Sequence, residues 1–169
     1  KKGEEQEAFA AYDSCLQRKD DNVMALNNYA YYLSEKGVDL HKAESMSYKT
    51  IKAEPNNGTY LDTYAWILFM EERYADAKTY IDQALKNRDS TADNSTVLEH
   101  AGDIYYMNGM TDESLDFWKK AYTGENQTEV LAWKIKNRQY ITEEELKKRN
   151  APKQKPAATK KSVRKGKKK

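Results

Sequence analysis

Cysteine, proline and glycine are scarce in this sequence. Its 169 residues contain one Cys, three Pro and seven Gly. The single thiol, Cys15, cannot form an internal disulfide, and so few Pro and Gly leave long stretches free to be helical. The sequence has no run of 18 apolar residues, which argues against a membrane-spanning helix. It also contains no Gly-rich phosphate loop and no nucleophile motif.

Tyrosine and charged residues, in contrast, are abundant. There are 13 Tyr, and 33% of the residues are charged, yet the net charge is only +2. Residues 147–169 contain 12 Lys or Arg and no Asp or Glu, whereas residues 1–146 contain 17 basic and 27 acidic residues. An acidic body therefore carries a basic tail, which indicates an interaction arm or a tail that contacts its own body.

Two markers recur along the acidic body with one period. Spacings of 35, 34 and 37 residues separate four small residues, Ala8, Ala43, Ala77 and Ser114. The same spacings separate the ends of the four segments, Asp20, Pro55, Asp89 and Asn126. Within the units, apolar or small residues fall three, one and three positions apart, as in Leu26, Tyr29, Ala30 and Leu33. This pattern is one face of a helix, and each complete unit is predicted to contain two helices.

Small residues recur where the paired helices must approach each other closely. They are Ala30, Ala65 and Gly102 in the first helices, and Ala43, Ala77 and Ser114 in the second helices. Only a small side chain fits at a close helix crossing. Larger residues one turn away, Tyr29, Tyr64, Ile81 and Trp118, are predicted to fill the flanking space.

The third unit is similar throughout to the tetratricopeptide repeat (TPR), whose pattern is W-x2-L-G-x2-Y, then A-x3-F, then P, with a period near 34. The matching residues are Leu61, Tyr64, Ala65, Leu68, Ala77, Ile81 and Ala84. No unit has the Trp of the pattern, and Ser47 occupies the aromatic position of the second unit. The resemblance covers residues 1–126 and implies an all-α, TPR-type α-solenoid, a right-handed superhelix of helix–turn–helix repeats with a C-terminal capping helix and a disordered basic tail.

The expected organisation has six parts. They are a partial TPR with a second helix only (1–20), three TPR units (21–55, 56–89 and 90–126), a capping helix region (127–149) and a disordered Lys-rich tail (150–169). Because the first unit lacks its first helix, we expect the chain to be a C-terminal fragment of a longer protein. In the capping region, Lys134, Lys136 and Arg138 are expected on the solvent side of a helix over 127–139. Thr142 and Glu145 form a capping-box pattern that predicts a further short helix.

The resemblance implies a non-catalytic scaffold that binds partner segments on the concave face of the first helices. The helical spacing i, i+4, i+7 assigns nine residues to this face: Asn27, Tyr31, Ser34, Asp62, Trp66, Phe69, Glu99, Asp103 and Tyr106. Their acids and aromatics favour a basic or neutral protein or peptide ligand. A clamp for a C-terminal carboxylate is not expected, because cations do not occupy the required positions. The alternative for Trp66 and Phe69 is packing on adjacent repeats.

No pattern in the sequence predicts catalysis, a metal site or a cofactor. His41 and His100 lie in different repeats without companions at metal-ligand spacing, and Cys15 occupies a small position where an inert buried thiol is expected. An enzyme whose catalytic domain precedes Lys1 remains an alternative function. The residues around Leu61–Phe69 look like bacterial members of the family, many of which are periplasmic or lipid-anchored, so the bacterial envelope is favoured over the cytoplasm.

The basic tail leaves three interpretations open. It could bind nucleic acid or an anionic surface, and its clusters at 147–149 and 160–169 loosely resemble a bipartite nuclear-import signal. It contains no aromatic residues, so stacking on bases is not indicated and nucleic acid is not favoured. The tail could instead serve only as a solubilising end, or it could contact the acidic groove of its own chain and compete with ligands.

Overall fold

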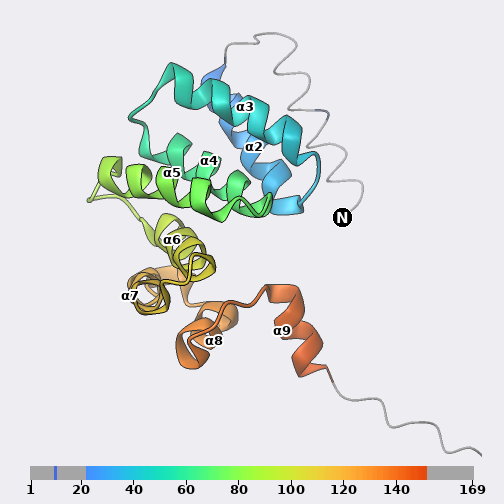
Figure 1. The fold of residues 1–169 in the computed structure, drawn as a ribbon, viewed down its shortest axis with the longest axis vertical. Helices are drawn as coiled ribbons and strands as arrows, with labels where there is room; N and C mark the ends of the chain where they lie inside the picture. The colour runs from blue at the N-terminus through green and yellow to red at the C-terminus, as the bar shows by residue number, and fades with distance from the viewer. Residues whose placement is uncertain (1–9, 11–21, 152–169) are drawn as a thin grey trace, which may run out of the picture.

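The described part of the chain is entirely helical (Figure 1). The computed structural model describes residue 10, which is helical, and residues 22–151. The latter hold eight α-helices: α2 (Val23–Lys36), α3 (Leu40–Ala53), α4 (Gly58–Met70), α5 (Tyr74–Asn87), α6 (Ser95–Met107), α7 (Thr111–Ala121), α8 (Glu129–Asn137) and α9 (Glu143–Asn150). A 3-10 turn, η1 (Gly124–Asn126), joins α7 to α8. Apart from Ala10, Asn150 and Ala151, the expected partial repeat and the expected disordered tail lie outside the described residues, as does Cys15.

Polar caps and one left-handed glycine set several of the helix ends. The side chain of Asn22 accepts a hydrogen bond from the Ala25 amide, and that of Asn57 accepts from two amides in the first turn of α4. Gly37, with φ of 63°, ends α2 because its amide can then bond the last carbonyls of the helix. The capping box predicted at Thr142 and Glu145 is present at the start of α9.

The helices pack as three consecutive pairs, α2–α3, α4–α5 and α6–α7, and each pair packs on the next. The small residues lie at these crossings as predicted, and Ala30, Ala65 and Ala77 have no exposed surface. At Gly102 the crossing is so close that an added Cβ atom would lie 2.3 Å from Cδ1 of Trp118. Only glycine therefore allows the Trp118 indole to lie against α6. The division into repeat units at 21–55, 56–89 and 90–126 remains our proposed division of these pairs.

Helix α8 covers the last pair, but its bounds and the position of Lys134 differ from the expectation. Helix α8 starts later and ends earlier than the expected 127–139, because Arg138 takes a left-handed conformation with φ of 54°. Leu131 is buried against the last pair, as a capping helix requires. The expectation that Lys134 faces solvent was wrong: it is 3% exposed. It turns inward because two carboxylates on α6, Glu99 and Asp103, balance its charge.

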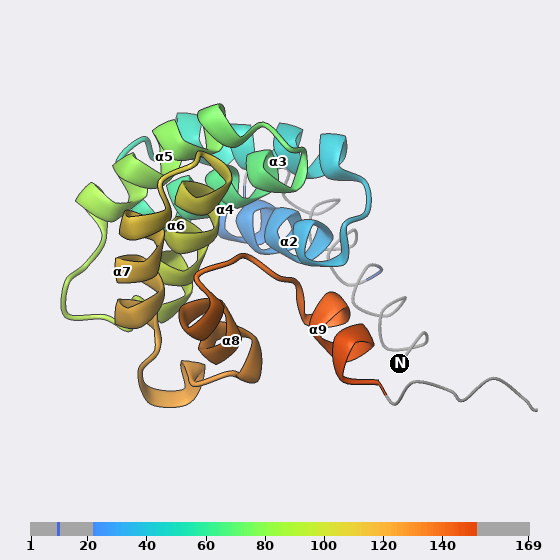
Figure 2. The same ribbon diagram turned by 60° about the horizontal axis from the view of Figure 1, so that its bottom comes forward.

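After α8 the chain runs back across the face formed by the first helices of the pairs, and α9 lies beside that face (Figure 2). Tyr140, in the link between α8 and α9, packs against Phe69 of α4 and Tyr106 of α6 at ring-centroid distances of 5.7 and 6.5 Å. Ile141 and Leu146 are buried as well. None of the described helices is both long and apolar enough to cross a membrane.

Candidate functional site

Two adjoining hollows open on the face formed by α2, α4 and α6. The larger hollow, about 860 Å³, lies between this face and α8–α9. The smaller hollow, about 590 Å³, lies at the N-terminal ends of α4 and α6 beside the loop between α5 and α6. Tyr31 and Thr96 line both hollows, so the two share a boundary.

The nine residues assigned to this face from the sequence lie on α2, α4 and α6 and differ in accessibility. The larger hollow is lined by Tyr31, Ser34, Trp66, Glu99 and Asp103, and the smaller one by Asn27, Tyr31 and Asp62. Phe69 and Tyr106 line neither hollow, because both pack against Tyr140. Five of the nine side chains are buried, namely Asn27, Ser34, Asp62, Phe69 and Asp103. Most of the predicted residues thus form the floor of the hollows or support it.

The aromatic residues of the floor stack on one another, both within α4 and between α4 and α6. The Trp66 indole lies parallel to the His100 ring, with centroids 4.1 Å apart and an interplanar angle of 11°. It also lies parallel to the Phe69 ring at 4.8 Å and 10°. Its Nε1–H donates a hydrogen bond to Glu35 at 2.9 Å. Trp66 thus contacts the neighbouring pairs through His100 and Glu35, whereas the ring contacts of Phe69 are to Trp66, to Tyr74 of its own pair and to Tyr140.

A buried Asp–His pair joins α4 to α6 beneath the two hollows. Nδ1 of His100 lies 3.0 and 3.2 Å from the two carboxylate oxygens of Asp62. Burial alone would lower the pKa of His100, but the carboxylates of Asp62, Asp103 and Glu35 outweigh it, so this pKa is raised above its usual value. His100 is therefore protonated more readily in the folded protein than in an unfolded chain.

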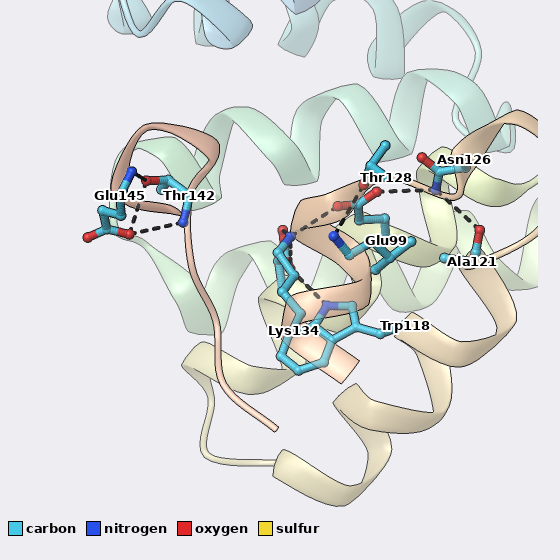
Figure 3. Close-up of polar contacts among 10 residues, drawn as sticks. Glu99, Trp118, Ala121, Asn126, Thr128, Lys134, Thr142 and Glu145 are labelled. Atoms are coloured by element: carbon cyan, nitrogen blue, oxygen red, sulfur yellow. Dashed lines mark hydrogen bonds and ion pairs between the residues drawn. The ribbon is translucent and has the colours of Figure 1, made fainter. Parts of the chain in front are cut away.

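A second polar network holds α8 against α6 (Figure 3). Nζ of Lys134 lies 2.8 Å from both carboxylate oxygens of Asp103 and 3.0 Å from Oε1 of Glu99. Nε1–H of Trp118 donates to Asp103 at 2.8 Å, and Nδ2 of Asn126 donates to Glu99 at 3.2 Å. Burial lowers the pKa of Lys134, but the two carboxylates raise it further than burial lowers it. The lysine stays charged although it is enclosed.

The hollows have a negative electrostatic character. Burial, together with the carboxylates of Glu35, Asp62 and Glu99, raises the pKa of the Tyr31 hydroxyl. Two acids that line the larger hollow, Glu35 and Glu129, form no salt bridge within the described ranges. In the smaller hollow, the amide of Asn27 is 4% exposed, and its Oδ1 has no hydrogen-bond partner in the described part of the chain. This face therefore carries negative charge, and beneath it lies one buried amide oxygen without a partner in the described part of the chain.

Sequence reasoning missed three residues of this site: His100, Lys134 and Tyr140. A signal for His100 does exist in the repeat register. Glu99 and Asp62 occupy equivalent positions in successive first helices, and His100 follows Glu99 directly, so the register places His100 on the helix next to that of Asp62. No comparable signal marks Lys134 or Tyr140, because they lie after the repeats. No group of three His, Cys, Asp or Glu side chains among the residues described here is placed to hold a metal ion.

Comparisons with known proteins agree with this architecture. No family model matches the chain. Over 71 residues, 42% of the chain, the sequence is 34% identical to a TPR repeat-containing protein of Pseudomonas aeruginosa, and this stretch spans 12% of that protein's length. The first TPR domain of the human RPAP3 protein superposes with a TM-score of 0.58 and 13% identity, over 69% of this chain and 88% of the domain. The N-terminal domain of stress-induced protein-1 from C. elegans gives a TM-score of 0.53 and 19% identity, over 70% of this chain and 94% of that domain.

The fold is thus that of a tetratricopeptide-repeat protein, and its relative by sequence is bacterial. TPR domains are generally protein–protein interaction modules and are typically non-catalytic. Their repeats stack into a scaffold whose first helices line one extended face. The two hollows described above lie on that face.

Proposed function

We propose that this TPR domain binds a segment of a partner protein in the two adjoining hollows on the face of α2, α4 and α6. The proposal is carried by the adjacency of these hollows, whose shared boundary is formed by Tyr31 and Thr96. Tyr31 is half-buried, so one side of the residue is fixed by the fold and the other remains available. Tyrosine in such a position contributes contact area with little loss of side-chain entropy.

The shape and polarity of the hollows favour an extended segment. An asparagine amide carries a donor and an acceptor, as a peptide group does, and the Oδ1 acceptor of Asn27 has no hydrogen-bond partner among the described residues. The acids Glu35, Glu99 and Glu129 along the larger hollow favour basic or neutral side chains over acidic ones. Of the nine residues assigned to the face, Phe69 and Tyr106 act indirectly, because they support Tyr140.

A displayed library of random peptides tests this function without any assumption about the sequence of the partner. We expect peptides that the full chain enriches to lose at least about tenfold in affinity, or about 1.4 kcal/mol, when Tyr31 is changed to Ala. Tyr48→Ala is the matched control, because Tyr48 is 46% exposed on α3, a second helix. Affinities would be measured by fluorescence anisotropy.

Two outcomes would contradict the proposed function. One is that no peptide is enriched over repeated selections. The other is that Tyr31→Ala and Tyr48→Ala weaken binding equally, which would place the ligand away from the hollows. Circular dichroism of both variants establishes that each retains the helical fold, so that a loss of binding is not a loss of structure.

A further inference from the structure

The basic tail of this chain has a binding place within reach on its own TPR domain. We propose that residues 153–169 dock into the larger hollow, between α2, α4, α6 and α9, and occupy it in the absence of a partner. The tail is thereby an internal competitor for the face that binds partner segments. The docking of the tail does not depend on whether a partner exists. Its role as a competitor of partner segments rests on the proposed function.

The chain leaves the described structure at the rim of this hollow. Lys147, Asn150 and Ala151 all line it. A residue of extended chain spans at most about 3.6 Å, so Lys153 lies within about 7 Å of Ala151 and Lys160 within about 32 Å. Every cluster of basic residues in the tail can therefore reach the hollow without movement of the folded part.

Opposite charges favour this contact. The segment 153–169 contains nine Lys or Arg and no acid. Glu35 on α2 and Glu129 on α8 line the hollow, and neither forms a salt bridge in the part of the chain that is described. Glu143, also at the hollow, is already paired with Lys147 at 2.5 Å. The tail thus supplies cations to a face on which two carboxylates lack them.

The same face already binds a lysine from the C-terminal region. The ammonium group of Lys134 lies between Asp103 and Glu99, 5.3 Å from the centre of the Tyr140 ring. A lysine beside acids and an aromatic ring is thus compatible with the shape of this groove. Glu35 offers a similar setting beside Trp66 and Tyr31.

Tethering makes even a weak contact effective. A segment attached at the rim of its own site has an effective concentration in the millimolar range for a short flexible linker. Individual ion pairs at a surface are weak and screened, so the docked tail exchanges rapidly and yields to a partner that binds better. The arrangement predicts that removal of residues 152–169 strengthens the binding of a basic peptide.

Paramagnetic relaxation in the full chain tests the docking directly. A nitroxide label at Ser162→Cys, in a Cys15→Ser background, would broaden the amide signals of nearby residues in an isotope-labelled protein. We expect the largest broadening at Tyr31, Glu35 and Glu129 rather than on α3, α5 or α7. Raising the salt from 0.1 to 1 M shortens the Debye length from about 10 to about 3 Å and should remove most of the effect.

Charge variants identify the contact. Glu35→Gln with Glu129→Gln keeps the hydrogen bonds that these side chains accept from Trp66 and Asn150, yet removes both charges. This pair should lower the broadening at the hollow at least about twofold. Glu113→Gln with Asp116→Asn, on the exposed side of α7, is the matched control and should leave it unchanged.

Several results would overturn the proposal. The first is that the broadening is strongest on another face of the domain. The second is that high salt, or the change of Glu35 and Glu129 to Gln, leaves the broadening unchanged. The third is that the Glu113 and Asp116 variant lowers the broadening as much as the Glu35 and Glu129 variant does. Broadening that appears only when labelled and unlabelled chains are mixed would assign the tail to a second copy and would equally overturn intramolecular docking. The peptide selections described above are read independently, so either hypothesis can fail while the other stands.

Discussion

Lys134→Met is the substitution that tests the C-terminal packing most directly. Methionine keeps the length and apolar stem of lysine but removes the charge that faces Asp103 and Glu99. Asp103 is 3% exposed and would keep only the hydrogen bond from Trp118. A carboxylate left buried without its cation costs about 3–5 kcal/mol, several times the value of an exposed ion pair. We expect a loss of that size in the free energy that holds α8 against α6.

Urea unfolding followed by circular dichroism, combined with hydrogen exchange, measures this loss. Exchange distinguishes unfolding of the whole array from detachment of α8 and α9 alone, because only the latter exposes the amides of residues 129–150 selectively. The variants Lys134→Met and Asp103→Asn, together with the double variant, form a cycle whose coupling energy should exceed about 1.5 kcal/mol. If Lys134→Met changes the stability by less than about 0.5 kcal/mol and leaves exchange in α8 unchanged, the buried network described here is wrong.

Three other perturbations have defined outcomes. Gly102→Ala places a Cβ atom 2.3 Å from Trp118 and should lower the free energy of unfolding by about 1–3 kcal/mol in urea titrations. Ala101→Gly, at the neighbouring position, is the comparison variant that adds no volume. The pKa of His100 is raised above 6.5, so the folded state binds the proton more tightly than the unfolded chain does, and stability should fall as the pH rises through this pKa. Asp62→Asn should flatten this pH dependence in thermal melts from pH 6 to 8. Deletion of residues 152–169 should leave the hollows able to bind peptides, with basic peptides bound more tightly, while it abolishes any salt-dependent binding of duplex DNA in anisotropy titrations. DNA binding that survives the deletion would refute an electrostatic role for the tail.

The repeat architecture could be predicted from the sequence because it depends on local contacts. Each helix pair packs only on its neighbours, so the same small residues are required at every crossing. Ala30, Ala65 and Gly102 mark one crossing in three successive pairs, and all three are buried. Some helix starts could be predicted for the same reason, because the residues that cap them are close in sequence. The capping box of Thr142 and Glu145 shows this most clearly.

The polar networks of the site could not be predicted from single positions. An isolated lysine on an amphipathic helix is expected at the solvent side, and only the acids on α6, more than 30 residues earlier, make the buried position of Lys134 favourable. The pairing of Asp62 with His100 spans 38 residues and depends on how two repeats stack. The assignment of the nine residues to a binding face therefore stays a prediction, and the accessibility of its members depends on elements outside the repeats.

The path of the C-terminal segment limits where a partner can bind. Tyr140 covers Phe69 and Tyr106, so the part of the face at these two residues is already occupied by the chain itself. On α2, Asn27, Tyr31 and Glu35 follow the spacing i, i+4, i+8 and line the two hollows in succession. Tyr31 and Glu35 are the accessible members of this stripe, whereas Asn27 is buried. Substitutions at Tyr31 should change affinity more than stability, whereas substitutions at Phe69 or Tyr106 should loosen Tyr140 and change stability first.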